Sequence, residues 1–95
     1  MPYHTTYNAG WKFRPQEARE HWFAMKDGDE LTLDAEPSNK YDPHAVKLMS
    51  GDVHVGYVPR DLSQEIAQRL GDDCITKVVK RAGGKIEIHY KQKGT

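Results

Sequence analysis

The segment from residue 45 to residue 58 constrains the fold of this chain more than any other. Apolar and polar residues alternate along residues 45–49 and again along residues 53–58, and the tripeptide Ser-Gly-Asp separates the two runs. Alternation with a period of two is typical of a half-buried strand, and a short polar loop with a glycine is typical of a hairpin turn. The segment therefore predicts two antiparallel strands, and one face of the second is expected to carry Val53, Val55 and Tyr57.

Other runs along the chain have the same character. The run at residues 30–35 alternates Leu31 and Leu33 with polar neighbours, and the pair Gly83-Gly84 separates two β-branched runs near the C-terminus. A glycine pair between such runs predicts a turn. Further strands are therefore expected at residues 5–11 (leading into a turn), 30–35, 75–80 and 85–90.

Two segments have the periodicity of amphipathic helices. In residues 15–25 a proline stands at the first position, and the apolar residues at helical spacing are Ala18, Trp22 and Met25. In residues 61–71, Asp61 is predicted to cap the helix with Gln64 as its capping-box partner, and a glycine ends the segment. The buried stripe of this second helix is expected to consist of Leu62, Ile66 and Leu70.

A chain of 95 residues is long enough for one domain with one small core, so residues 1–95 are expected to form a single unit. Short strands in an open sheet leave edges that other chains can pair with, and closure of the sheet removes most of those edges. We therefore predict a mainly β fold, a small OB-like or SH3-like barrel of five or six strands with two short helices.

The composition argues against several classes of protein. The chain has no run of about 18 apolar residues, which a membrane-spanning helix requires, and its first residues lack the charged-then-apolar pattern of a signal peptide. The single cysteine, Cys74, has no partner for an intrachain disulfide and is expected to be a small buried side chain. These features favour a cytoplasmic protein that does not contact a membrane.

The net charge of zero argues against strong nonspecific binding to nucleic acid. The charge is nevertheless unevenly distributed. From Lys77 onward the chain has six basic residues and one acidic residue, Glu87, which gives +5 there and leaves −5 for the remainder. This asymmetry indicates either one basic face or a solvated edge strand whose lysines oppose aggregation.

The residues that usually carry catalysis or bind metals are not arranged for either purpose. No two of the five histidines are four residues apart, and there is no second cysteine. The chain also lacks the nucleophile elbow of hydrolases and a phosphate-binding glycine loop. We therefore expect no catalytic residue, no metal site and no cofactor, and we predict a binding protein rather than an enzyme.

The turn-rich segment at residues 36–43 places an aromatic ring, Tyr41, beside a carboxylate, Asp42, between two predicted strands. One interpretation is structural: Asp42 bonds the backbone of the turn, and Tyr41 packs on the wall of the barrel. The other is functional, because nucleobases stack on exposed aromatic rings at about 1–3 kcal/mol per base. Tyr7 and Tyr57 lie on or next to other predicted strands, and would then share one groove with Tyr41.

The central motif of the chain resembles that of the HIRAN domain. It reads Glu36-Pro37-x-Asn39-x-Tyr41-Asp42-x-x-Ala45-Val46, followed by Gly56-Tyr57-Val58-Pro59-Arg60. HIRAN domains occur in SWI/SNF-type ATPases that remodel stalled replication forks, and as small bacterial and phage proteins. The resemblance implies an OB-like barrel that binds 3′ ends of single-stranded DNA in repair or replication, with a helicase or SWI/SNF-type ATPase as a partner in trans.

The resemblance also implies roles for individual residues. Tyr7 and Tyr41 would hold the terminal nucleotides, and Tyr57 would line the pocket. Asp42 would contact the free 3′-hydroxyl. Fork remodellers of the family have an arginine where this chain has Thr6, so one phosphate contact is expected to be missing. The remaining phosphate contacts are expected from Lys40, Lys47, Arg60 and the basic residues near the C-terminus, although Arg60 could equally open a helix and remain solvated.

The predicted role of Asp42 has a simple chemical basis. A free 3′-hydroxyl donates a hydrogen bond to a carboxylate, whereas a phosphate in its place has no proton to offer and repels the negative charge. A carboxylate would therefore select strand ends against internal nucleotides. Two alternatives stay open at this point. Surface tyrosines on a small barrel also suit an extended peptide, and a family member without the arginine and without net charge could have lost DNA binding.

Overall fold

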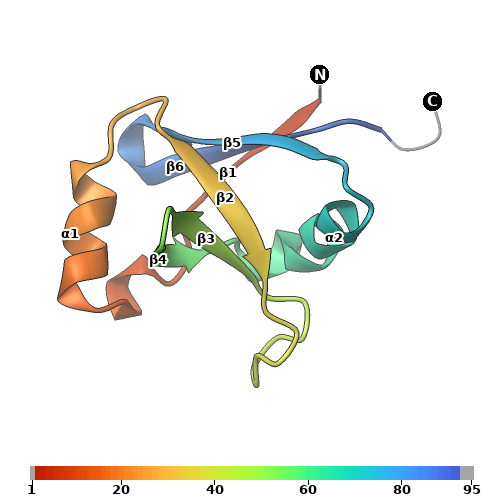
Figure 1. Ribbon diagram of the computed structural model, residues 1–95, viewed down its shortest axis with the longest axis horizontal. Coiled ribbons are helices and arrows are strands. Elements are labelled where there is room, and N and C mark those ends of the chain that lie inside the picture. Colours follow the sequence, from red (N-terminus) through yellow and green to blue (C-terminus); the bar gives the residue numbers. More distant parts are fainter. Residues whose placement is uncertain (1, 93–95) are drawn as a thin grey trace.

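Residues 2–92 are described by the computed structural model, which contains six strands and two α-helices (Figure 1). The strands are β1 (Tyr3–Tyr7), β2 (Glu30–Ala35), β3 (Val46–Ser50), β4 (Val53–Tyr57), β5 (Ile75–Arg81) and β6 (Lys85–Tyr90). The helices are α1 (Gln16–Ala24) and α2 (Arg60–Gly71), and single 3-10 turns form η1 (Trp11–Phe13) and η2 (Ala82–Gly84). Every strand expected from the sequence is present, and β2 and β6 have the predicted bounds. The first strand lies at residues 3–7 rather than 5–11.

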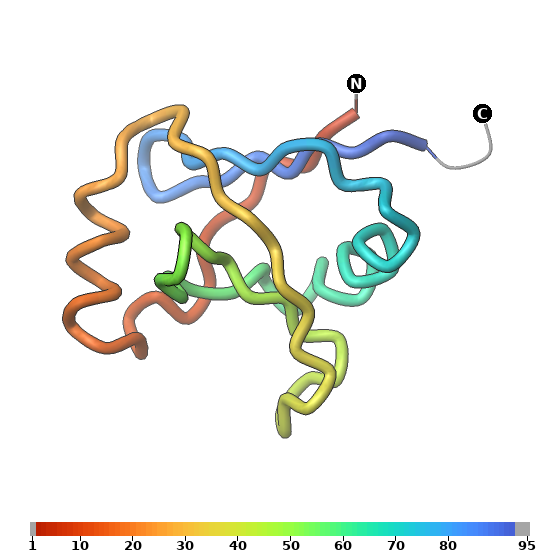
Figure 2. Tube along the Cα trace, in the orientation of Figure 1, coloured from red at the N-terminus to blue at the C-terminus, as the bar shows by residue number. Residues whose placement is uncertain are grey.

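The strands form one curled antiparallel sheet in the order β1-β6-β5-β2-β3-β4. Its two edges meet just beyond β1, where the chain in Figure 2 passes from β1 towards η1. There the Ala9 N–H donates to the Tyr57 carbonyl at 2.9 Å, and the Tyr57 N–H donates to the Ala9 carbonyl at 2.8 Å. The predicted small barrel is therefore confirmed as a curled half-barrel, and one bridge joins its edges.

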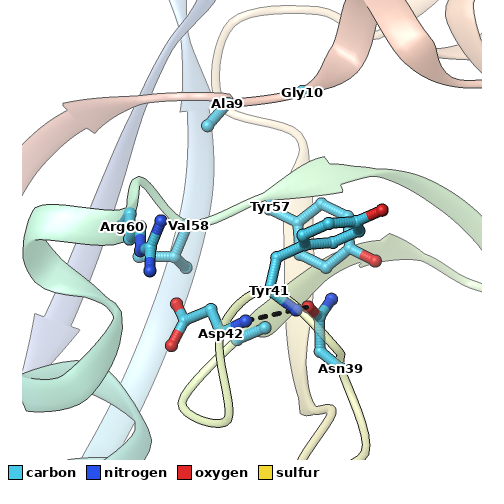
Figure 3. A pocket seen from close by; sticks show the side chains of 9 residues that line it. Ala9, Gly10, Asn39, Tyr41, Asp42, Tyr57, Val58 and Arg60 are labelled. Carbon is cyan, nitrogen blue, oxygen red and sulfur yellow. Dashed lines mark hydrogen bonds between the residues drawn. The ribbon is translucent and has the colours of Figure 1, made fainter.

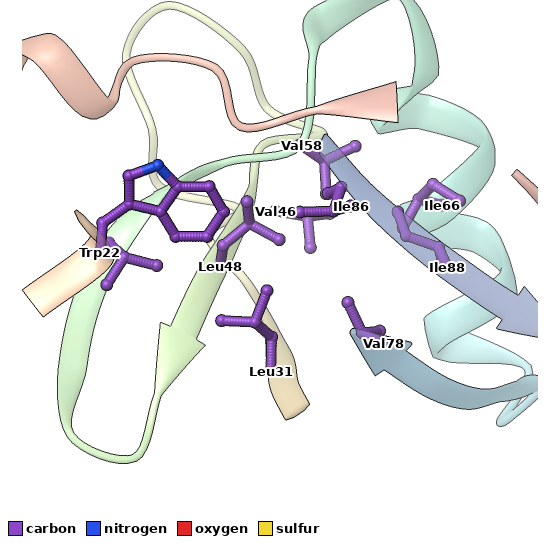
Figure 4. Packing of buried hydrophobic residues seen from close by; sticks show 10 residues of the cluster. Trp22, Leu31, Val46, Leu48, Val58, Ile66, Val78, Ile86 and Ile88 are labelled. Carbon is purple, nitrogen blue, oxygen red and sulfur yellow. The ribbon is translucent and has the colours of Figure 1, made fainter. Parts of the chain in front are cut away.

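The core lies inside the curl of the sheet, and both helices contribute to it (Figure 4). Trp22 of α1 enters at one end and is 2 % exposed, and Ile66 of α2 enters from the other side and is fully buried. Burial of each such side chain is worth roughly 1.5–3 kcal/mol. The residues between them come from the strands, apart from Val58, which directly follows β4. They are Leu31, Val46, Leu48, Val55, Val58, Val78, Ile86 and Ile88. The predicted buried faces of both helices are confirmed, because Ala18 is also buried and Leu62 and Leu70 pack against this core.

The predicted hairpin is present, but a β-bulge changes the face on which Tyr57 lies. The register between β3 and β4 shifts between Leu48 and Met49, so that Val55 has no paired residue. Val55 still points into the core, whereas the Tyr57 ring lies against the His54 ring with a centroid distance of 4.7 Å. The expectation that Tyr57 shares a face with the two valines of β4 is therefore wrong.

The predicted cap of α2 is also wrong. The helix begins one residue earlier than expected, with Pro59 at the N-cap position and Asp61 inside the first turn. Proline has no side-chain oxygen to accept from the first N–H groups of the helix, and the described residues form no side-chain cap hydrogen bond there. At the other end Gly71 is the last helical residue, and Asp73 takes the left-handed backbone conformation with a φ of 57°.

Neither interpretation of the basic C-terminal segment is fully met. Its strands, β5 and β6, lie inside the sheet rather than at an edge, and a basic face is incomplete because one of its members is internal. Lys80 is 8 % exposed, and its ammonium donates to the carbonyls of Trp22 and Met25 at the end of α1. Arg81 forms ion pairs with Asp27 and Glu87. Three exposed lysines of the group remain at the surface, and its last member, at residue 93, lies outside the described residues.

The fold tests the predicted burial of Cys74 and the predicted lack of a membrane-spanning helix. Cys74 is buried, 4 % exposed, as predicted. Within residues 2–92, neither helix has the length and apolar character needed to cross a membrane.

Candidate nucleic-acid interface

Asn39 organises the loop between β2 and β3. Its Oδ1 accepts hydrogen bonds from the backbone N–H groups of Tyr41 at 2.8 Å and Asp42 at 3.0 Å. Its Nδ2 donates to Oε1 of Glu36 at 2.8 Å. Asparagine side chains stabilise tight turns in this way, by taking the place of a backbone acceptor. The loop therefore presents Tyr41 and Asp42 in a defined orientation.

Asp42 is half-buried and holds two further contacts. Its Oδ1 accepts from the N–H of His44 at 2.9 Å, and its Oδ2 accepts from the Ser63 hydroxyl of α2 at 2.6 Å. The Ser63 hydrogen bond lowers the pKa of Asp42, and the His44 N–H and the charge of Arg60 act in the same direction, against a smaller effect of burial. The carboxylate is ionised at neutral pH. Because its two oxygens have about four acceptor positions, it can accept another donor.

Tyr57 is held by its hydroxyl, which donates to Oε1 of Glu36 at 2.9 Å. Glu36 therefore joins the loop to β4, since the same oxygen accepts from Asn39. Burial and this contact raise the pKa of Tyr57, while the Asn39 and Tyr57 hydrogen bonds lower the pKa of Glu36. Both groups stay in the forms that make the contact, a neutral phenol and a carboxylate, at neutral pH.

His54 supports the other side of the Tyr57 ring. The two rings meet edge to face, with an interplanar angle of 80°. The Nε2 of His54 lies 2.9 Å from the carbonyl of Gly56, and Arg14 donates from Nε to the carbonyl of His54 at 2.9 Å. Burial lowers the pKa of His54, and the nearby charge of Arg14 adds to the effect. The imidazole is therefore neutral at pH 7 with its proton on Nε2, because a carbonyl oxygen only accepts.

An open pocket lies between the loop, β4 and the segment after β1 (Figure 3). Its cavity volume is about 210 Å³. Figure 3 shows the Tyr41 ring in front of the Tyr57 ring, and the Asp42 carboxylate on the side of Arg60. The residues that line the pocket are Ala9, Gly10, Asn39, Tyr41, Asp42, Ala45, Tyr57, Val58 and Arg60.

The pocket brings together four of the six predicted site residues: Tyr41, Asp42, Tyr57 and Arg60. Lys40 is exposed next to Tyr41 and does not line the pocket. The expectation of one groove shared with Tyr7 is wrong. That tyrosine lines a neighbouring hollow with residues 8–13, and the two cavities share only Ala9 and Gly10 as lining residues.

The structural and the functional interpretations of the turn at residues 36–43 are both partly met. Asp42 does bond the backbone of the loop, as the structural interpretation expects. Tyr41, however, is 82 % exposed and does not pack on the barrel wall. A further phosphate candidate, Lys47, lies 3.4 Å from the carboxylate of Asp34 and is therefore already paired. Arg60 is exposed at the first residue of α2, and it both opens the helix and lines the pocket.

Sequence reasoning missed the residues that shape the pocket from a distance. Ser63 stands 21 residues after Asp42, and its serine side chain gives no signal in the sequence of an amphipathic helix. Asn8 is buried over Gly56, where an added Cβ would lie 1.6 Å from its Oδ1. The glycine before Tyr57 could have indicated such a close approach, because glycine inside a strand often marks one.

The described residues 2–92 contain no group of three His, Cys, Asp or Glu side chains that could hold a metal ion. The arrangement instead offers an exposed ring, an ionised acceptor and a guanidinium around one opening. That set suits a ligand with a flat group, a hydroxyl donor and a negative charge.

Comparisons with known proteins agree with the fold. The family model of the HIRAN domain matches residues 3–91. Among solved structures, the crystal structure of the HIRAN domain of human HLTF superimposes with a TM-score of 0.75 at 14 % sequence identity, over 93 % of this chain and 74 % of that chain. No curated protein sequence matches the chain. The chain therefore belongs to the HIRAN domain family, which is known as a family of DNA-binding domains.

Proposed function

We propose that this protein is a binding module for the 3′-hydroxyl end of single-stranded DNA, and that it acts in DNA repair or replication without converting a substrate. The terminal base would lie against Tyr41, and the terminal sugar would lie at Asp42. A helicase or SWI/SNF-type ATPase acting in trans would generate or use the bound end. The observation that carries the proposal is the 82 % exposed ring of Tyr41 beside an ionised carboxylate that lines the same pocket.

The loop backbone that carries the exposed ring is held in place before any ligand arrives. The backbone N–H of Tyr41 is bonded to Asn39, which is itself bonded to Glu36. A platform that is ordered in the free protein loses less conformational entropy on binding than a mobile one does. This favours a stacking role for Tyr41 over a role in the core.

Asp42 supplies the selectivity in this proposal. A 3′-hydroxyl can donate to the carboxylate, and hydrogen bonds to charged groups contribute about 1.5–3 kcal/mol. A 3′-phosphate brings negative charge to the same place. Arg60 and the N-terminus of α2, which carries a partial positive charge, lie on the same side of the pocket and suit the phosphate that precedes the terminal sugar.

The test compares single strands of one sequence that end in a 3′-hydroxyl or a 3′-phosphate, with binding followed by fluorescence anisotropy. The wild type is expected to prefer the hydroxyl by about tenfold or more, the equivalent of one charge-assisted hydrogen bond. Asp42→Asn removes the charge while keeping the shape, and should remove this preference. Asp61→Asn is the matched control, because Asp61 is an exposed acid in the first turn of α2 outside the pocket. Equal wild-type affinities for the two ends would refute end recognition.

Salt dependence separates DNA from an extended peptide as the ligand. Each phosphate contact contributes a slope of about −0.7 to the dependence of log affinity on log salt for single strands. An affinity that hardly changes between 50 and 200 mM salt would point to an apolar ligand instead. Tyr41→Ala should weaken binding to both kinds of end, because stacking does not depend on the end group.

A further inference from the structure

A second hollow lies directly beside the pocket. It has a volume of about 440 Å³, and the segment from Tyr7 to Phe13 forms its whole lining. The two cavities meet at Ala9 and Gly10, which line both. Gly10 has a φ of 73°, which L side chains rarely adopt, and an added Cβ there would lie 3.6 Å from the Tyr57 ring.

Two large aromatic side chains face solvent at this hollow. Phe13 is 89 % exposed and Tyr7 is 58 % exposed. Within residues 2–92 neither ring stacks on another ring. The backbone that carries Phe13 is nevertheless ordered, because its N–H donates to the Gly10 carbonyl at 3.0 Å in the tight turn of η1. An apolar ring that is open to water and projects from an ordered turn is a ready stacking surface.

Cationic side chains accompany these rings. Lys12 lines the hollow beside Phe13 and is exposed. Lys85 of β6 is the directly opposite partner of Tyr7 in the antiparallel pair with β1, so both side chains leave the same face of the sheet. Aromatic rings interleaved with lysines are the usual surface for single-stranded nucleic acid, in which bases stack and phosphates are held by charge.

We propose that this hollow is a second subsite for the same strand. Nucleotides on the 5′ side of the bound terminus pass over Gly10 from the pocket into the hollow. A base then stacks on Phe13, while Lys12 and Lys85 hold the adjoining phosphates. This rests on the proposed function, because the pocket must hold the terminal nucleotide for the strand to continue in this direction. The ligand is therefore a strand of several nucleotides rather than a free nucleotide.

The first test uses 3′-hydroxyl oligothymidylates of two, four, six and eight nucleotides. Wild-type affinity is expected to rise with length until the hollow is occupied. Phe13→Ala should lower affinity for the six- and eight-nucleotide strands by at least about fivefold and leave the dinucleotide unchanged, since one stacked base is lost. Tyr3→Ala is the matched control, because Tyr3 is also exposed on β1 but its ring stacks on His89 away from the hollow.

The second test measures the salt slope with the eight-nucleotide strand. Lys12→Gln should reduce its magnitude by about 0.7, the value for one phosphate contact on a single strand. Lys26→Gln is the control, because Lys26 is equally exposed but follows the far end of α1. Neither Lys12 nor Lys26 is part of the core, so neither substitution should change the salt slope by unfolding the protein.

The outcomes distinguish this inference from the proposed function. If the wild type prefers 3′-hydroxyl ends but Phe13→Ala binds long strands as the wild type does, the second subsite is refuted and end recognition stands. If Phe13→Ala weakens long strands while the wild type shows no end preference, the stacking surface stands and the pocket does not select ends. If no strand binds more tightly than the dinucleotide, the second subsite is refuted as well.

Discussion

At the scale of single residues, the candidate site depends on a contact between two residues that do not line the pocket. Asn8 lies buried over Gly56, and its Nδ2 donates to the carbonyl of Val55 at 3.0 Å. This contact fixes the chain just before Ala9, which forms both the rim of the pocket and the bridge to β4. The site is therefore sensitive to a glycine whose own atoms do not line it.

Gly56→Ala is expected to destabilise the protein by about 1–3 kcal/mol, the usual cost of overpacking. The added Cβ would lie 1.6 Å from Asn8 Oδ1, so the Asn8 side chain and the segment after β1 must move. Gly71→Ala is the control: nothing lies within 4 Å of its added Cβ, and alanine favours the helix by about 0.5–1 kcal/mol. Urea unfolding measures both. Equal stabilities for the two variants would contradict the close approach.

Ser63→Ala should raise the pKa of Asp42 towards its ordinary value, because the Ser63 hydroxyl is the largest cause of the lowered pKa. A carboxyl group with a lowered folded-state pKa adds stability that is fully present above its unfolded pKa and is lost as pH falls through the folded one. The variant should therefore be less stable by about 1 kcal/mol at pH 7, and the difference should shrink below pH 4. Carboxyl chemical shifts of Asp42 during an acid titration test the first statement directly. An unchanged titration curve would show that Ser63 does not set the charge of this group.

At the scale of elements, much of the secondary structure follows from local pattern. Residues 30–35 alternate so regularly that the bounds of β2 could be predicted, and the hairpin of β3 and β4 follows from its turn. The bulge at Val55 could not be predicted, because it depends on the pairing partner across the hairpin. The start of α2 was mispredicted because Asp61 looks like a cap from the sequence, while Pro59 takes that position in the fold.

The buried Lys80 joins β5 to the end of α1, and its replacement tests that connection. Lys80→Met keeps the length of the side chain but removes the ammonium that donates to the carbonyls of Trp22 and Met25 and lies above the Trp22 ring. The Trp22 carbonyl keeps the Met25 N–H as a donor at 3.3 Å. The expected cost is about 1–3 kcal/mol for unsatisfied buried groups. Lys77→Met is the control, because Lys77 lies on the same strand but is exposed. It should change the free energy of unfolding by no more than about 0.5 kcal/mol. Thermal unfolding of both variants measures the difference, and equal melting temperatures would refute a structural role for Lys80.

At the scale of the whole molecule, the pocket exists because distant segments meet. Its lining comes from the chain after β1, the loop before β3, and the end of β4 with the start of α2. The sequence could suggest Tyr41, Asp42 and Tyr57 as site residues because they stand in one recognisable motif. It could not place Tyr7 in a separate hollow, because that depends on how the edges of the sheet close around Ala9.

This closure leads to a prediction about the effect of the ligand. The bridge between Ala9 and Tyr57 is the single pairing that joins the two edges of the sheet among the described residues, whereas β5 and β6 pair along most of their lengths. Regions with few hydrogen bonds open locally at lower free energy than the global unfolding of the domain. The amides of Ala9 and Tyr57 should therefore exchange with deuterium faster than that of Ile88 in the free protein.

Ala9 and Tyr57 both line the pocket, so a strand end bound there as proposed would contact both sides of this bridge, and binding should slow the exchange of these two amides in particular. At a free ligand concentration of 100 times Kd, local opening that requires release of the strand would become about a hundredfold rarer, or 2.7 kcal/mol less favourable. A 3′-phosphate strand at the same concentration should protect them less, and Ile88 should not change with either. Protection that spreads evenly over the domain, or that leaves Ala9 and Tyr57 as they were, would place the bound strand elsewhere, because only a ligand seated across the bridge is coupled to its opening.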